Sequence, residues 1–262
     1  MYRLITLFLI LSISLLAYSD MDMDGVDDEV DKCPNTPLTE LVDLSGCTIK
    51  KLVSPHHFDI SLGINHIENS NIKIDTTSIE FDYYYKDLSL SLYSSYFNRD
   101  IYNEKESGVD DTYIDGYYNI KATDRLSFKI GGSVALPTYN SDNNRVDYTL
   151  SSYINYYYNN NLSVLGGVGY TVIGDNDTNT TIYKNSLFYS IGLGYYFNDS
   201  FYSSLTYNSA SSIYKNSDDI KNISLYNYYN IDKHWFLNLS YTHGLNSASM
   251  KRTIGGRVGY YW

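Results

Sequence analysis

The stretch "RTIGGRVGYYW", residues 252–262, closes this sequence of 262 residues and determines how the rest is interpreted. Read in steps of two, it places Ile254, Val258, Tyr260 and Trp262 on one face and small or polar residues on the other. This alternation predicts a β-strand with one apolar face. The tip of a terminal strand frays in water, so a tryptophan there predicts that an apolar environment meets the tip.

Eleven further segments with strand-like patterns precede this one, and no helical period interrupts them. A composition with 31 tyrosines and only 4 prolines also favours strands with polar turns. Most of the segments have about ten to thirteen residues, enough for a tilted crossing of a bilayer, whereas strands of soluble proteins average about five or six. The predicted strands are 56–66, 76–86, 87–97, 112–122, 125–137, 145–157, 161–173, 185–197, 200–210, 220–230, 233–243 and 251–262.

The connections between these strands alternate between short and long. The short ones centre on "YKD", "TDR", "NNN", "NDS" and "IDK", and the long ones include "NRDIYNEKESGVDD", "TYNSDNNR", "GDNDTNTT" and "SIYKNSDD". Outer-membrane barrels have tight turns on the periplasmic side and longer loops outside. A soluble sandwich would show the same apolar alternation, but not the strand length or a girdle of aromatic residues beside the short turns. That girdle would comprise Tyr85, Tyr156, Phe197, Phe201, Trp235 and Trp262.

We therefore predict an all-β fold, a 12-stranded antiparallel up-and-down transmembrane β-barrel over residues 55–262. The final strand resembles that of bacterial outer-membrane β-barrel proteins, which commonly ends in an aromatic residue with apolar residues at alternate positions before it. The resemblance implies that Tyr260 and Trp262 form a signal for the barrel-assembly machinery. It also implies a place in the lipid of the outer membrane of a Gram-negative bacterium. Because the short turns, the N-terminal segment and Trp262 fall on one side of an even-stranded barrel, the N-terminus is predicted to lie in the periplasm.

The first 19 residues are predicted to be a signal peptide. Arg3 precedes the apolar run "LITLFLILSISLLA", and Ala17 and Ser19 are small residues at the positions that a signal peptidase reads. The alternative, a retained membrane helix, is disfavoured because the run is short for a full span and acidic residues follow at once. Cys33 and Cys47 of an exported chain are then predicted to form a disulfide.

An acidic segment follows the proposed cleavage site. Its aspartates stand at positions 1, 3, 5, 9 and 12 of a calcium loop, with Gly25 at position 6 and the carbonyl of Val26 at position 7. The continuation "DKCPNTPLTELVDLSGC" resembles the thrombospondin type 3 repeat, which implies a structural Ca²⁺ site and a bond between the two cysteines. Residues 20–54 are predicted to form this clip, which could also meet a periplasmic protein; a disordered acidic leader is the alternative. The predicted ligands are Asp20, Asp22, Asp24, Val26, Asp28 and Asp31.

The more apolar parity of each strand is assigned to lipid and the other parity to the lumen. Phe58, Ile60, Leu62 and Ile64 face outward in the first strand, as do Leu187, Tyr189, Ile191 and Leu193 in the eighth. At the closing seam this parity brings Arg257 beside Asp59, with Glu80 one strand further on. Placing charges inward agrees with the cost of a charged side chain on the lipid face. The predicted lumen charges are Asp59, Glu80, Asp82, Asp115, Lys121, Lys129, Asp147 and Arg257.

These features favour a narrow, porin-like diffusion channel for small solutes. A formal charge of -11 without a basic stripe argues against a nucleic-acid partner. Twelve strands fall between filled eight-stranded barrels and wide sixteen-stranded pores, so an anchoring barrel with a plugged lumen stays an alternative. No catalytic residue is predicted, because no phosphate-binding loop, metal cluster or nucleophile elbow is present. A phospholipase-like barrel with His66 or His243 at the outer rim is the remaining alternative.

Overall fold

The structure is a computed structural model that describes residues 56–141, 143–178 and 180–262, together with residues 28, 31–33, 45 and 47. The chain divides into two compact units, Met1–Ser54 and Pro55–Trp262. Within the described residues, no helix is both long and apolar enough to span a membrane. The predicted signal peptide lies outside this part of the chain.

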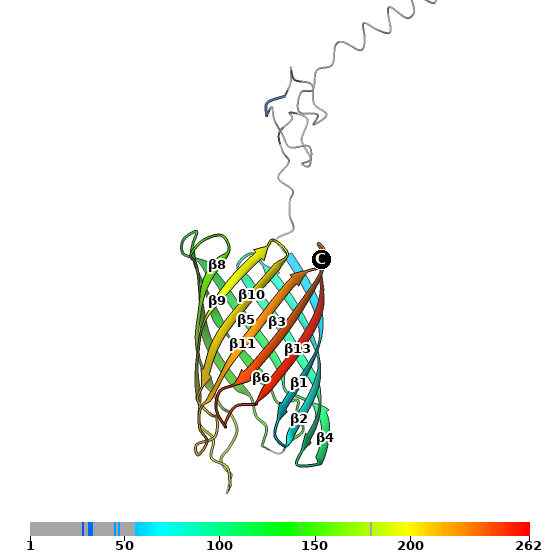
Figure 1. Ribbon diagram of the computed structural model, residues 1–262, viewed down its shortest axis with the longest axis vertical. Helices are drawn as coiled ribbons and strands as arrows, with labels where there is room; N and C mark the ends of the chain where they lie inside the picture. The colour runs from blue at the N-terminus through cyan, green and yellow to red at the C-terminus, as the bar shows by residue number, and fades with distance from the viewer. Residues whose placement is uncertain are drawn as a thin grey trace, which may run out of the picture. The chain divides into compact units, whose positions relative to one another are not determined.

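Thirteen strands form the described part of the second unit, all in one sheet (Figure 1). They are β1 (His56–Asn69), β2 (Ile72–Tyr85), β3 (Leu88–Ile101), β4 (Glu104–Val109), β5 (Thr112–Lys121), β6 (Leu126–Leu136), β7 (Asp147–Tyr157), β8 (Leu162–Val172), β9 (Ser186–Asn198), β10 (Phe201–Ala210), β11 (Ile220–Asn230), β12 (Trp235–Gly244) and β13 (Arg252–Tyr261).

Twelve of these strands close into a barrel in which each pairs antiparallel with the next. β13 returns to β1 in a register that runs from Asp59 opposite Tyr261 to Glu68 opposite Arg252. Phe58 and Trp262 extend this seam, since each donates its amide to the other's carbonyl, at 3.3 and 3.0 Å. Closure leaves the barrel wall without an edge in lipid, which confirms the predicted 12-stranded barrel.

β4 is the thirteenth strand and lies outside the barrel wall, since it pairs with β3 alone (Figure 1). It falls in the connection 98–111, which was predicted as a loop. Tyr102 and Asn103 join β3 to β4 with φ of 53° and 69°, the left-handed backbone that a tight primed hairpin turn requires. The turn could not be recognised in the sequence because neither residue is glycine, which is the usual signal of a turn with positive φ.

The first hairpin also differs from the prediction. β1 and β2 were predicted to end at 66 and begin at 76, but they continue to Asn69 and from Ile72, leaving only two residues between them. In the extended part of this hairpin, the outward face carries cross-strand pairs of opposite charge, such as Glu68 opposite Lys73. Nearer the middle of the barrel the same face carries apolar residues that meet lipid. Charges replace those apolar residues in the extended part, so the apolar alternation ended before the strands did.

The two faces of the barrel wall differ in side-chain size. Outward residues of β1 are large and exposed, with Leu62 at 56% and Ile64 at 67%, whereas inward Ser61 and Ser78 are each 3% exposed. The side chains of all six predicted girdle residues are on the outward parity beside the short turns or the C-terminus. Trp262 stacks on Phe58 with ring centroids 5.8 Å apart. The terminal tryptophan therefore belongs to an aromatic patch at one membrane interface.

Candidate functional site

A row of carboxylates crosses the inner wall of the barrel. Asp59 of β1 lies opposite Asp82 of β2, Asp82 lies opposite Ser91 of β3, and Ser91 lies opposite Asp115 of β5. All four side chains have the inward parity. The hydroxyl of Ser91 donates a short hydrogen bond to Oδ1 of Asp82. Three carboxylates at one level of four adjacent strands concentrate negative charge on this wall.

Arg257 of β13 supplies the nearest positive charge, although its partner differs from the predicted one. It lies opposite Gly63 of β1, and its guanidinium forms an ion pair with Glu80 of β2, whereas Asp59 lies opposite Tyr261. Gly63 has no side chain to block the path, so the arginine crosses β1 and reaches the second strand. The prediction placed Arg257 beside Asp59, with Glu80 one strand further on. The ion pair is with Glu80, while Asp59 is near enough to Arg257 for an electrostatic attraction.

A second cation, Lys129 of β6, also faces the lumen. Its ammonium group lies 4.7 Å from the ring centroid of Tyr117 on the neighbouring strand, which is cation–π geometry. Arg257 makes a similar, longer contact of 5.8 Å with the ring of Tyr93. Aromatic faces in this lumen thus accommodate positively charged groups.

Aromatic residues continue around the lumen on the neighbouring strands. Tyr228 of β11 stacks on Phe236 of β12 at 5.7 Å, and Phe236 stacks on Tyr261 of β13 at 5.9 Å. Gly259 permits this row, because a Cβ there would lie 2.0 Å from Cζ of Phe236. Phe236 is 7% exposed, so the row is packed against the wall.

One cavity of about 420 Å³ joins the carboxylates, the two cations and the aromatic row. Its wall runs from β11 through the closing seam to β6. Oδ1 of Asp59 and Oγ of Ser89 are inaccessible to solvent and have no hydrogen-bond partner within the described residues. The lining residues are Asp59, Ser61, Glu80, Asp82, Tyr84, Ser89, Ser91, Asp115, Tyr117, Lys129, Tyr226, Tyr228, Phe236, Asn238, Arg257 and Tyr261.

Two of the eight predicted lumen charges stand apart from this cavity. Lys121 is exposed at the end of β5 and pairs with Asp124 in the following turn at 3.2 Å. Asp147 begins β7 at the other end of the barrel, where its Oδ1 accepts a hydrogen bond from the amide of Gly174 at 2.7 Å. The first pair borders one opening of the barrel, and the second fastens a long loop to the barrel wall.

A three-residue cluster that the sequence did not reveal joins β3, β4 and the loop between β6 and β7. Arg99 forms an ion pair with Glu106, and the hydroxyl of Tyr139 donates to Oε1 of Glu106 at 2.8 Å. Nη2 of Arg99 lies 2.8 Å from the same tyrosine oxygen. The Tyr139 hydrogen bond, followed by the Arg99 contact, lowers the pKa of Glu106, which lies beyond the membrane-spanning part of the wall. The contact could not be predicted because Tyr139 is 33 residues from Glu106 within a connection read as a loop.

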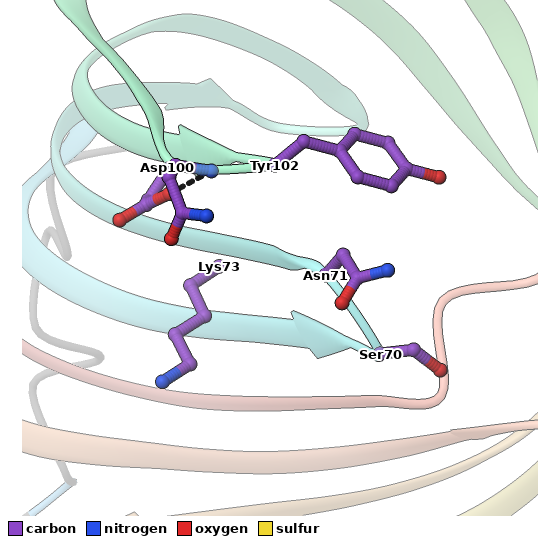
Figure 2. A pocket seen from close by; sticks show the side chains of 6 residues that line it. Ser70, Asn71, Lys73, Asp100 and Tyr102 are labelled. Carbon is purple, nitrogen blue, oxygen red and sulfur yellow. Dashed lines mark hydrogen bonds between the residues drawn. The ribbon is translucent and has the colours of Figure 1, made fainter.

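The tips of the β1–β2 and β3–β4 hairpins border a separate pocket of about 310 Å³ (Figure 2). The amide of Tyr102 donates to the carbonyl of Asn71 at 3.0 Å, and the amide of Asn103 donates to Asp100 at 3.1 Å. Lys73 and Asp100 lie on the parity that faces lipid further down the barrel. This pocket is therefore outside the lumen and does not border a path through it.

The two histidines considered for catalysis lie on the outward parity. Nδ1 of His66 is 2.7 Å from Oδ1 of Asp75, and its Nε2 lies 3.9 Å from Glu68. Across the described residues, the other ring nitrogen of His66 thus meets a carboxylate and not a hydroxyl. A carboxylate on Nδ1 would orient the imidazole as a base, but no nucleophilic hydroxyl lies beside its Nε2 within the described residues.

The N-terminal unit is described at only a few residues. Cys33 and Cys47 form a disulfide with an S–S distance of 2.05 Å, as predicted. The amide of Cys33 donates to Oδ1 of Asp31 at 2.8 Å, and the amide of Lys32 donates to the carbonyl of Ser45 at 2.9 Å. Of the predicted calcium ligands, Asp28 and Asp31 are among the described residues. The other four, Asp20, Asp22, Asp24 and Val26, lie outside them.

Comparisons with known proteins agree with the barrel. The COG4313 outer membrane channel from Pseudomonas putida F1 is similar over 79% of this chain and 95% of that chain, with a TM-score of 0.67 and 10% identity. The NanC porin is similar over 78% of this chain and 98% of its own, with a TM-score of 0.51 and 12% identity. Both likenesses concern the fold, which is that of an outer-membrane β-barrel.

Sequence comparisons give the family. No protein among the curated ones matches this sequence. Residues 50–261 match the family model described as "Putative MetA-pathway of phenol degradation". Since the match covers nearly the whole barrel unit, the chain belongs to that family.

Proposed function

We propose that this protein is a narrow diffusion channel that lets small solutes cross the outer membrane. The observation that carries the proposal is the lumen cavity, whose wall is built from carboxylates, hydroxyls and tyrosines and not from packed apolar side chains. A barrel that served only as an anchor would gain stability from filling this space with interlocking side chains. The resemblance of the fold to two outer-membrane channels supports the same function.

The test is conductance of the refolded full-length chain in planar lipid bilayers. Discrete, salt-dependent current steps support a channel. Silence over a range of salts and voltages, from protein that shows the heat-modified gel mobility of a folded barrel, would favour the anchor instead. Phospholipid hydrolysis lost in His66→Ala would favour an enzyme. We expect none because no nucleophilic hydroxyl lies beside Nε2 of His66 within the described residues.

The clip extends this proposal at the N-terminus. The spacing of the aspartates and the disulfide support a calcium-bound segment that follows a cleaved signal peptide and stands in the periplasm. There it could contact a periplasmic protein, while the final strand serves as the signal for the assembly machinery. A pull-down of periplasmic proteins by residues 20–54 fused to a carrier, with and without calcium, tests the partner.

A further inference from the structure

We infer that the lumen cavity selects small organic cations, with the carboxylate row binding an ammonium group and the tyrosines contacting the rest of the solute. The inference rests on the proposed channel function and names the class of solute that the channel favours. Three observations carry it: the balance of charge in the cavity, three unpartnered oxygens in its wall, and an ammonium group of the protein already placed on a tyrosine there.

The charge of the cavity is negative after its internal pairs are counted. Glu80 is neutralised by Arg257, to which it is ion-paired. Within the described part of the chain, none of Asp59, Asp82 and Asp115 has a lysine or arginine within ion-pair distance. Lys129 is the one remaining cation of the lining, and its ammonium group lies on Tyr117. The carboxyls of Asp59 and Asp82 are hydrogen-bonded to each other, which requires one proton shared by the pair. The remaining two negative charges still exceed the one ammonium, so the cavity attracts cations and repels anions.

Three oxygens in the wall lack the donors that buried oxygens require. Ser89 is 5% exposed and its Oγ has no partner, and Oδ1 of Asp59 and Oδ1 of Asn238 are inaccessible and equally without a donor within the described residues. Unpaired buried oxygens are costly, and a rotation of these side chains toward the cavity would present the acceptors to the N–H donors of a solute. Asp59 lies directly opposite Asp82, so a positive charge between them would also take the place of the proton that the two carboxyls share.

Lys129 shows how an ammonium group is held in this cavity. Its position over the ring of Tyr117 is the geometry that a solute amine would adopt over other tyrosines. Tyr226 is suited to this, because it is 36% exposed, lines the cavity, and makes no ring contact or hydrogen bond to the other described residues. Carboxylates alone would attract inorganic cations equally well; the aromatic faces add a preference for organic ones.

The test compares three probes of similar shape and different charge on the refolded full-length protein: benzylammonium, benzyl alcohol and benzoate. We expect isothermal titration calorimetry to show at least about tenfold tighter binding of benzylammonium than of the neutral alcohol, since a charge-assisted contact adds about 1.5–3 kcal/mol. We expect no binding of benzoate. In bilayers under a KCl gradient, the sign of the reversal potential should show that K⁺ permeates better than Cl⁻. Benzylammonium should block the K⁺ current.

Variants separate the carboxylates from the aromatic face. Asp59→Asn and Asp115→Asn should each lower the K⁺/Cl⁻ permeability ratio and weaken benzylammonium binding severalfold, whereas Asp124→Asn, an equal charge change in an exposed turn, should alter neither. Tyr226→Leu should weaken benzylammonium binding about fivefold and leave the K⁺/Cl⁻ ratio unchanged. Each variant is first checked for barrel closure by gel mobility.

The outcomes distinguish this inference from the channel function itself. Current without a preference for cations, or equal binding of the ammonium and the alcohol, overturns the inference and leaves the channel intact. Absence of current overturns the channel, and benzylammonium binding to that silent barrel would show that the site exists without conduction. An effect of Asp124→Asn equal to that of Asp59→Asn would show that overall charge, and not the cavity, determines the preference.

Discussion

Replacing Arg257 by alanine should destabilise the barrel at its closing seam. The arginine is 29% exposed and its partner Glu80 is 18% exposed, so both charges are largely removed from water. Oε2 of Glu80, the oxygen that meets the guanidinium, is itself inaccessible to solvent. In the variant this carboxylate would stay in the wall near Asp59 and Asp82 without its cation.

The expected loss follows from the burial of the pair. Breaking a fully buried pair costs about 3–5 kcal/mol, and exposed pairs contribute about 0–1 kcal/mol. Because this pair is about three-quarters buried, we expect Arg257→Ala to lower the free energy of unfolding by about 2–3 kcal/mol. Arg257→Glu should cost more, because it adds a further negative charge beside Glu80.

The seam contains its own matched control. Arg252 of β13 pairs with Glu68 of β1, and its Nε lies 2.7 Å from Oε2 of the glutamate, but the arginine is 50% exposed. Arg252→Ala therefore should change stability by less than about 1 kcal/mol. Urea unfolding in detergent micelles, followed by gel mobility and tyrosine fluorescence, measures both. The reasoning is refuted if Arg257→Ala loses no more stability than Arg252→Ala.

Three further changes have defined outcomes. Gly259→Ala should slow folding and lower the free energy of unfolding by about 1–3 kcal/mol, because the new Cβ would lie 2.0 Å from the ring of Phe236. Gly256→Ala in the same strand is the control, since its nearest neighbouring atom would be 3.6 Å away. Refolding yields of the two variants test this difference. Removing calcium with a chelator should speed proteolysis within residues 20–47 and leave the barrel folded, and equal cleavage with and without chelator would contradict the proposed site. Because the pKa of Glu106 is lowered, its stabilisation of the Tyr139 loop is complete above the ordinary carboxylate range and is lost as pH falls through the lowered pKa. Hydrogen exchange of the loop should therefore become faster at low pH, and in Glu106→Gln it should be fast at every pH. Slow exchange in Glu106→Gln would show that the cluster does not hold the loop.

The barrel could be predicted from sequence because its signals are periodic and local. Leu62 and Ile64 project to lipid for the same reason that Ser61 and Gly63 line the wall, namely the two-residue period of a strand. The number of strands and the side of the short turns follow from counting. The sequence gives less information where that apolar alternation stops, which is why β4 and the outer ends of β1 and β2 were missed.

The pairing of lumen charges depends on register and side-chain reach, which a period cannot supply. The prediction that Arg257 faces inward follows from parity, but its choice of Glu80 over Asp59 depends on Gly63, whose missing side chain opens the path across β1. The Arg99, Glu106 and Tyr139 cluster is a similar case, because it depends on how a loop folds back on the sheet. Non-local contacts of this kind need the closed structure.

The ion pair at the seam links the stability of the barrel to the preference of its lumen. Arg257 stabilises closure by neutralising Glu80, and by doing so it also limits the negative charge of the cavity. Its removal should therefore weaken the barrel and raise the preference for cations together. Asp59→Asn acts in the opposite sense, since it removes a carboxyl group that faces Asp82 and forms no ion pair within the described residues. The carboxylates of the cavity that form no ion pair do not stabilise the fold. Selection of a positively charged solute would give these carboxylates a function.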